Sequence, residues 1–147
     1  MLDMTRTELL VFMRNHFLGV IATASPQGDP QAAVVGIAVT ERFELVFDTL
    51  AETRKVTNLR QSPKIACVIG WDDEQSVQYE GIADEPKGLE LDRLKRYYFG
   101  KFPDGPVRQS WPGITYIRVR PTWIRYSDFR DNDAVVVEFK GDELLDA

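Results

Sequence analysis

Residues 44–61 read ELVFDTLAETRKVTNLRQ, a strand pattern that runs directly into a helix pattern. Leu45 and Phe47 occupy alternate positions, which predicts a β-strand over residues 44–49. Two apolar residues three apart then predict a short helix over residues 52–61, and a Ser-Pro pair follows as a stop signal. The stretch therefore predicts a strand, a tight connection and a helix within eighteen residues.

Thr53-Arg54-Lys55 stands at the expected start of this helix, shortly after Phe47-Asp48-Thr49 ends the strand. A helix N-terminus carries unpaired N–H groups and a partial positive charge, and a threonine hydroxyl with two cations adds charge-assisted hydrogen bonds. This arrangement predicts a cradle for the phosphate group of a small ligand. The same pattern also fits a capped surface helix that carries two solvated bases.

The elements on either side are mainly strands. Thr5 and Glu8 have the spacing of a capping box, and apolar residues then recur at helical intervals until Gly19, so a first helix is expected there. A second long helix is expected from Pro86 to Gly100. The expected strands, besides the one quoted above, cover residues 20–24, 31–39, 65–71, 77–83, 114–120 and 123–127.

The tally is six or seven strands with two or three flanking helices, and it lacks the strand–helix–strand rhythm of a parallel sheet. A closed or partly open antiparallel barrel follows, in a mainly β (α+β) chain. A length of 147 residues suits one domain over residues 1–147. Residues 129–147 are acidic and could form a loosely packed tail, in which Val135 to Val137 could be an edge strand or a partner contact.

Composition excludes several classes of function. The net charge of −5 argues against binding to nucleic acid or to an anionic membrane surface. The single cysteine, Cys67, allows no intrachain disulfide and no zinc cluster, which fits a reducing cytoplasm. No stretch approaches the ~20 apolar residues of a membrane span. His16 is the sole histidine and has no carboxylate or cysteine at ligand spacing, so no metal site is expected.

Seven short motifs occur in a recognisable order. They are Leu18-Gly19-Val20, Val46-Phe47-Asp48-Thr49, Thr53-Arg54-Lys55, Asn58-Leu59, Ser62-Pro63, Ile69-Gly70-Trp71 and Val77-Gln78-Tyr79-Glu80-Gly81. In this order and spacing the chain resembles the pyridoxamine 5'-phosphate oxidase-like family of FMN-binding split barrels. The resemblance extends over most of the chain up to Asp128.

The resemblance implies a homodimer with FMN in a cleft between the two subunits. Carried over by position, Arg54 and Lys55 would bind the FMN phosphate, and Thr49 and Thr53 would add hydrogen bonds. The resemblance also places Gly36, Ile37 and Ala38 along the isoalloxazine ring, where a flat ring requires small side chains and free backbone groups. A further cofactor contact is expected from Gln75 or Ser76. Trp71 could line the pocket or pack in the core or the dimer interface, and Trp111 in the long loop could reach the flavin of the partner subunit or anchor the loop.

Two departures from the oxidases concern the substrate. Their arginine and lysine in the strand that here covers residues 31–38 are absent, and their basic C-terminal segment is replaced by an acidic one. Oxidation of pyridoxamine 5'-phosphate itself is therefore not expected. Tyr97 and Lys101 fall where the oxidases hold the substrate phosphate, so an anionic substrate is still compatible with the sequence.

The resulting hypothesis is an FMN-dependent oxidoreductase in which the flavin carries hydride or electrons to a small substrate, with no side chain nominated as a catalytic acid or base. One alternative is a deazaflavin-dependent reductase of the same fold, whose phosphate-rich cofactor would use the same two bases. Another is a flavin-binding or ligand-free stress or regulatory protein without turnover.

Overall fold

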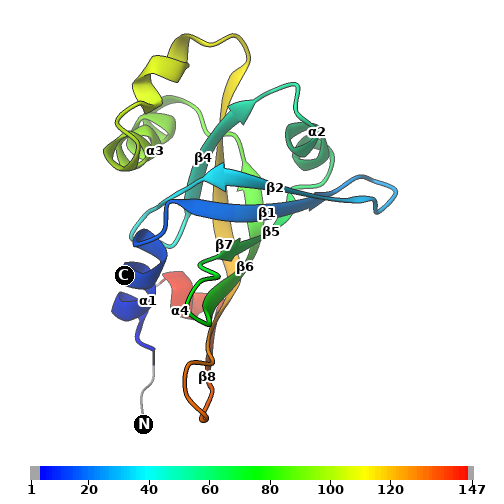
Figure 1. Cartoon of the computed structure of the whole chain (residues 1–147). Coiled ribbons are helices and arrows are strands. Elements are labelled where there is room, and N and C mark those ends of the chain that lie inside the picture. The colour runs from blue at the N-terminus through cyan, green and yellow to red at the C-terminus, as the bar shows by residue number, and fades with distance from the viewer. Residues whose placement is uncertain (1–3, 146–147) are drawn as a thin grey trace.

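One curved antiparallel sheet organises the chain in the computed structural model, which describes residues 4–145 (Figure 1). Its strands are β1 (Leu18–Ala24), β2 (Pro30–Gly36), β3 (Ala38–Val39), β4 (Leu45–Leu50), β5 (Lys64–Ile69), β6 (Gln75–Asp84), β7 (Ile114–Asp128) and β8 (Val135–Lys140). The helices of the described chain are α1 (Arg6–Arg14), α2 (Arg54–Gln61), α3 (Gly88–Lys101), the 3-10 helix η1 (Gly105–Ser110) and α4 (Asp142–Leu145).

The strands follow the order β2-β1-β5-β6-β7-β4-β3, and every pairing is antiparallel. Strand β7 is long enough to pair with β4 through its first half and with β8 through its second half. The sheet is therefore the predicted mainly β split barrel, with helices inserted between its hairpins. In Figure 1, α2 and α3 lie at the upper end of the sheet, whereas α1 and α4 lie beside its lower half.

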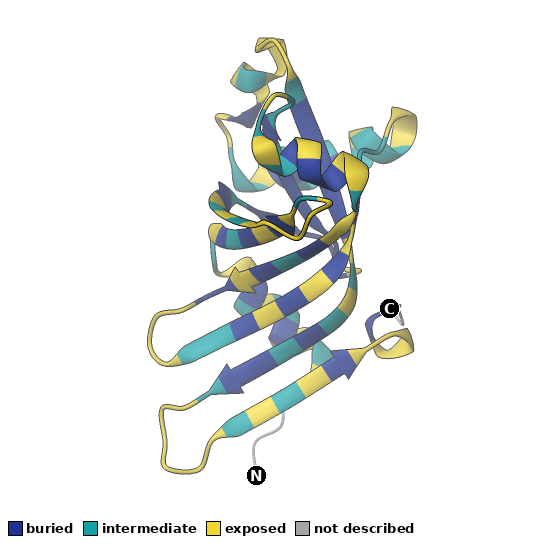
Figure 2. Ribbon diagram, turned by 90° about the vertical axis from the view of Figure 1, so that its right-hand side faces the viewer, coloured by how far each residue is buried: buried dark blue, intermediate teal, exposed yellow. Residues whose placement is uncertain are grey.

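The inner face of the sheet forms the core together with the helices. Fully buried side chains come from α1 (Leu9, Met13), from α2 (Val56) and from α3 (Leu94). Amphipathic helices bury such apolar stripes because removal of apolar surface from water dominates the stability of a domain. Along the strands, buried and exposed residues alternate, as Figure 2 shows.

Strand β7 is continuous where the sequence predicts two strands separated by Pro121. The register with β6 shifts between Glu80 and Gly81, and Gly81 then pairs with Pro121. Such a β-bulge accommodates the missing N–H of proline without ending the strand. Gly81 lies so close to β7 that an added Cβ would stand 2.3 Å from the backbone oxygen of Arg120. Only glycine fits there without displacement of the sheet.

The first helix and the strand predicted over residues 31–39 also differ from the sequence prediction. Helix α1 begins with the predicted capping box at Thr5 but ends at Arg14, because the chain turns into β1, and Phe17 accepts a backbone hydrogen bond from Ile37. The strand predicted over residues 31–39 is divided into β2 and β3. Each half pairs with a different neighbour, β1 and β4 respectively, so the chain bends between them.

The described part of the acidic C-terminal segment is packed against the barrel. Strand β8 pairs with β7 over its six residues, and Phe139 and Leu144 are buried. The last two residues of the predicted tail lie outside the described residues. No helix within residues 4–145 is both long enough and apolar enough to cross a membrane.

Candidate functional site

The start of α2 brings four of the predicted cofactor residues together. Thr53 is the N-cap in an extended conformation, but its side chain does not cap the helix. Its hydroxyl instead donates to the backbone oxygen of Leu50 at 2.9 Å and lies 3.5 Å from the hydroxyl of Thr49. The backbone N–H groups of the first helical turn therefore have no side-chain acceptor at the cap, which leaves them available to an anion.

The two bases that follow, Arg54 and Lys55, have no acidic partner in the part of the chain that the structure describes. Within residues 4–145, neither Arg54 nor Lys55 forms an ion pair or a side-chain hydrogen bond. Arg54 is exposed, whereas Lys55 is half-buried and its pKa is lowered because burial removes water from the ammonium group. A cation that is partly desolvated and unpaired is stabilised when an anion binds beside it.

Arg108 and Arg60, in the upper half of the barrel, are paired with carboxylates. The Arg108 guanidinium donates to Asp48 at 2.7 Å, and Tyr98 donates to the same carboxylate at 2.9 Å. Arg60 makes two hydrogen bonds of 2.9 Å to Glu85. These pairs hold α2, α3 and η1 against their neighbours. The positive charges of Arg54 and Lys55, in contrast, are not balanced by an ion pair within the described residues and can interact with an anionic ligand.

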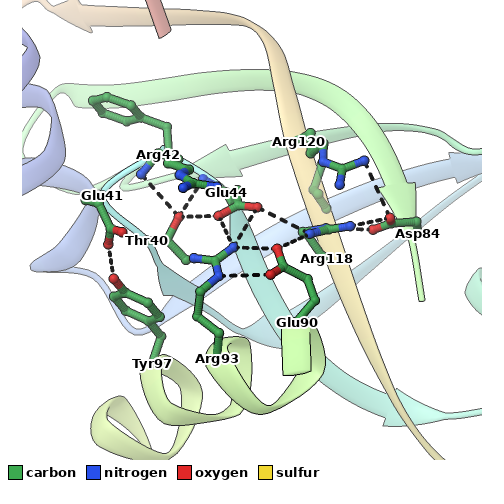
Figure 3. A network of polar contacts seen from close by, with 12 residues as sticks. Thr40, Glu41, Arg42, Glu44, Asp84, Glu90, Arg93, Tyr97, Arg118 and Arg120 are labelled. Carbon is green, nitrogen blue, oxygen red and sulfur yellow. Dashed lines mark hydrogen bonds and ion pairs between the residues drawn. The ribbon is translucent and has the colours of Figure 1, made fainter. Parts of the chain in front are cut away.

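A larger ion network, drawn in Figure 3, fastens α3 to the sheet. The buried side chains of Glu44 and Arg118 lie at its centre. Arg118 donates to Asp84 at 2.6 and 2.9 Å and to Glu90 at 2.6 Å, while Arg93 bridges Glu44 and Glu90. The sequence patterns did not predict this network. Its local signal was a charged residue next to core residues: Glu44 directly precedes β4, and Arg118 lies between the buried residues Ile117 and Val119 of β7.

Trp111 lies at the same end of the barrel as the start of α2. Its loop returns to β4, since the Ala51 N–H donates to the Gly113 carbonyl at 2.7 Å. The indole is 49% exposed. It is thus available to a ligand or a partner near Thr49 and Thr53.

The segment expected to border the flavin ring, residues 36–38, has no exposed side chain of Ile37 or Ala38. Ile37 and Ala38 are buried in the core, and an added Cβ at Gly36 would meet the ring of Phe102 at 2.8 Å. The Ile37 N–H is already bonded to Phe17. The ring of Phe102 therefore packs over Gly36, and a flat ligand ring along this segment would lie beside Phe102 and not against open backbone.

Gln75, Ser76 and Trp71 lie at the opposite end of the sheet. Gln75 accepts a hydrogen bond of 2.8 Å from Tyr126 and lines a cavity of about 490 Å³ between α1 and the β7–β8 turn. Trp71 is 49% exposed and lines a smaller cavity of about 230 Å³ beside His16. The structure does not bring these three residues to the start of α2 within one chain.

Tyr97 and Lys101 have partners inside the chain. The Tyr97 hydroxyl donates to the Glu41 carboxylate, and the Lys101 ammonium donates to the backbone oxygen of Arg14. Lys101 also lies 4.4 Å from the centre of the Phe17 ring, and burial lowers its pKa. A substrate phosphate would have to compete with these contacts.

The curved antiparallel sheet with helices between its hairpins defines the class of a split β-barrel. The model of the family "Pyridoxamine 5'-phosphate oxidase" matches residues 5–128, and the chain belongs to this family. A curated relative, the pyridoxine/pyridoxamine 5'-phosphate oxidase of Rubrobacter xylanophilus, is 31% identical over 93 residues, which are 63% of this chain and 41% of that protein. The chain thus spans less than half the length of this relative.

Solved structures share the fold at low sequence identity. A haem-binding protein of Mycobacterium smegmatis superposes with a TM-score of 0.81 and 16% identity, over 99% of this chain and 62% of that one. The conserved hypothetical protein Rv2991 of Mycobacterium tuberculosis has a TM-score of 0.71 and 24% identity, over 85% of each chain. These likenesses establish the fold.

Proposed function

We propose that this chain binds FMN as a homodimer and that the bound flavin exchanges hydride or electrons with a small substrate. The observation that carries the proposal is the pair of unpaired bases, Arg54 and Lys55, at an uncapped helix start in a member of this oxidase family. A phosphate monoester carries a charge of about −1.5 to −2 at neutral pH, which two bases balance. The hydroxyls of Thr49 and Thr53 are close enough to add hydrogen bonds.

The distance between the two groups of candidate residues supports a dimer. Thr49, next to the start of α2, pairs with Thr115 of β7, and Gln75 pairs with Asp128 of the same strand. These two positions on β7 are thirteen residues apart, roughly 43 Å along the strand at about 3.3 Å per residue. One flavin that meets both the start of α2 and the Gln75 end must therefore receive them from two copies of the chain.

The outer face of the sheet is suited to contact with a second copy. Val20 lies opposite Val34 on one side and Val68 on the other, and the last two are 60% and 38% exposed. Leu18 and Ile82 extend this apolar surface and are 48% and 41% exposed. Contiguous apolar patches of this kind mark interaction sites in soluble proteins. Burial of the patch in a symmetric dimer would remove it from water.

The flavin, when bound, supplies the hydride or electron transfer. The residues of the chain hold and orient it: Arg54 and Lys55 neutralise the phosphate, and residues 36–38 border the ring together with Phe102. The strand that carries bases in the oxidases has alanine and valine here, so the proposal does not extend to oxidation of a pyridoxamine phosphate. The substrate is a small molecule of another kind.

The absorbance spectrum of the purified protein tests the proposal. We expect the visible bands of bound flavin, release of FMN on denaturation as identified by mass, and a dimer by light scattering. The double variant Arg54→Ala/Lys55→Ala should lose the bound flavin. The control Lys87→Ala/Arg96→Ala removes the same charge from two exposed bases that form no ion pair or side-chain hydrogen bond within residues 4–145, and it should stay yellow. Colourless protein without affinity for added FMN contradicts the proposal.

The same preparation separates the rival readings. Tighter binding of a deazaflavin in competition with FMN would favour a deazaflavin-dependent reductase. Bound flavin that no electron acceptor reoxidises after reduction would favour a regulatory role without turnover. A Soret band would favour haem, the ligand of the similar mycobacterial protein. A histidine-ligated haem would depend on His16, whose Nδ1 lies 2.8 Å from the Phe12 carbonyl and whose Nε2 carries the remaining lone pair.

A further inference from the structure

A chain of buried hydrogen bonds joins α2 to the hairpin of β1 and β2. Asn58 of α2, 8% exposed, donates from its side-chain amide to the Thr23 hydroxyl of β1 at 3.0 Å. Thr23 is 4% exposed and donates in turn to the amide oxygen of Gln31 in β2 at 3.3 Å. Thr23 and Gln31 are direct partners in the strand register. Three separate elements therefore meet in one polar relay.

The relay determines how the Gln31 amide is oriented. A threonine hydroxyl has one proton, and because Thr23 accepts from Asn58, that proton is free for the Gln31 oxygen. The oxygen of Gln31 is thus held towards Thr23, and its NH₂ group faces away. This group has two donor protons and no hydrogen-bond partner within residues 4–145. Gln31 is half-buried, so the amide is reachable from solvent.

The relay also lies on the side of α2 that carries a proposed phosphate ligand. Asn58 follows Lys55 by three residues, and side chains at this spacing are neighbours on a helix surface. On β2, Gln31 and Ala33 share the face opposite the exposed residues Ala32 and Val34. Neither Gln31 nor Ala33 brings a charge to this face, where the oxidases of the family have a base in the strand.

We propose that the Gln31 amide is an uncharged phosphate ligand, which donates to the same phosphate that Arg54 and Lys55 bind. This inference rests on the proposed function, and it identifies a binding residue that motif comparison does not supply. Arg54 and Lys55 already balance the charge of a phosphate monoester, so a neutral donor adds directional hydrogen bonds without excess positive charge. Thr23 and Asn58 are positioning residues, because they orient the amide and do not touch the ligand.

Titration of the flavin-free protein with FMN and with riboflavin, followed by flavin fluorescence, tests the inference. A hydrogen bond to a charged acceptor corresponds to about tenfold in affinity. We therefore expect Gln31→Ala to weaken FMN binding about tenfold and Gln31→Glu to weaken it further by repulsion. Riboflavin, which lacks the phosphate, should bind both variants as it binds the wild type. Gln27→Glu introduces the same charge at the exposed tip of the same hairpin and should bind FMN normally.

Substitutions at Thr23 test the positioning role. Thr23→Ser keeps the hydroxyl and should retain affinity for FMN, whereas Thr23→Val keeps the shape but breaks the relay and should lose affinity as Gln31→Ala does. In combination with Gln31→Ala, Thr23→Val should cause no further loss. Thermal unfolding of each variant shows that it is folded.

Two results would overturn the inference: equal FMN affinities for Gln31→Glu and Gln27→Glu, or an equal loss of riboflavin affinity. Failure of the wild type to bind FMN at all would instead overturn the proposed function, and this inference with it. The wild-type titration therefore distinguishes the two failures.

Discussion

Substitution of Gly81 by alanine tests the bulge that makes β7 continuous. The added Cβ would stand 2.3 Å from the Arg120 carbonyl oxygen and 2.7 Å from a methyl group of Val119. The nearer atom belongs to the backbone of β7, which pairs with β6 at Arg120 itself and with β4 up to Val119, so it cannot rotate away freely. Overpacking of a rigid site costs roughly 1–3 kcal/mol. For a domain of this size each kcal/mol lowers Tm by about 3 °C, so a fall of about 3–9 °C is expected.

Urea unfolding and thermal unfolding, at one protein concentration and pH, measure the effect. Gly100→Ala is the matched control, because no atom lies within 4 Å of an added Cβ and the residue is inside α3. Alanine has the higher helix propensity, so this variant should gain about 0.5 kcal/mol. The same chemical change would then have opposite signs at the two positions. A Gly81→Ala protein as stable as the wild type would refute the close approach of β6 to β7.

Three further outcomes follow from buried or paired groups. Arg118→Met should lower the free energy of unfolding by about 3 kcal/mol, because it leaves Glu44 buried with fewer partners. Arg120→Met, which removes an exposed base 3.6 Å from Asp84, should lower it by less than about 0.5 kcal/mol. Equal losses in urea unfolding would contradict this difference. Hydrogen bonds from Arg130 lower the pKa of Asp128 to about 2, so the ionised carboxylate stabilises the fold above about pH 4 and this stabilisation disappears as the pH falls towards 2. The free energies of unfolding of Asp128→Asn and the wild type should therefore converge over that pH range. A constant difference between them would contradict the lowered pKa of Asp128. Burial raises the pKa of Cys67 to about 12, so a thiol reagent near neutral pH should modify it only after unfolding, and rapid labelling of the native protein would show an open site.

Local sequence patterns were sufficient to predict much of the fold. The capping box at Thr5, the strand that becomes β4 and the helix that begins after Thr53 all depend on residues within one or two turns of each other. The antiparallel arrangement of the strands followed from turn signals between alternating segments, whereas eight strands are present in the described chain where six or seven were predicted. The start of α2, where Thr49, Thr53, Arg54 and Lys55 meet, was predicted because strand and helix are joined by a short connection.

The ends of helices and strands that depend on strand pairing could not be predicted from the sequence. Proline at residue 121 is a local signal to end a strand, and it was outweighed by a bulge at Gly81 forty residues away. The end of α1 likewise depends on where β1 finds its partners. In both cases the deciding contact lies on a neighbouring strand, which a sequence window does not contain.

The partners of the charged residues were decided by the tertiary structure alone. Arg118 meets Asp84 and Glu90 because β7 lies beside the end of β6 and under α3, whereas Arg54 and Lys55 form no ion pair with any residue of the described chain. The sequence also did not show that Gln75 lies at the opposite end of the sheet from the start of α2. The physical reason is that hydrogen bonds and ion pairs act over a few ångströms in space, and closure of the sheet determines which distant residues come within that range.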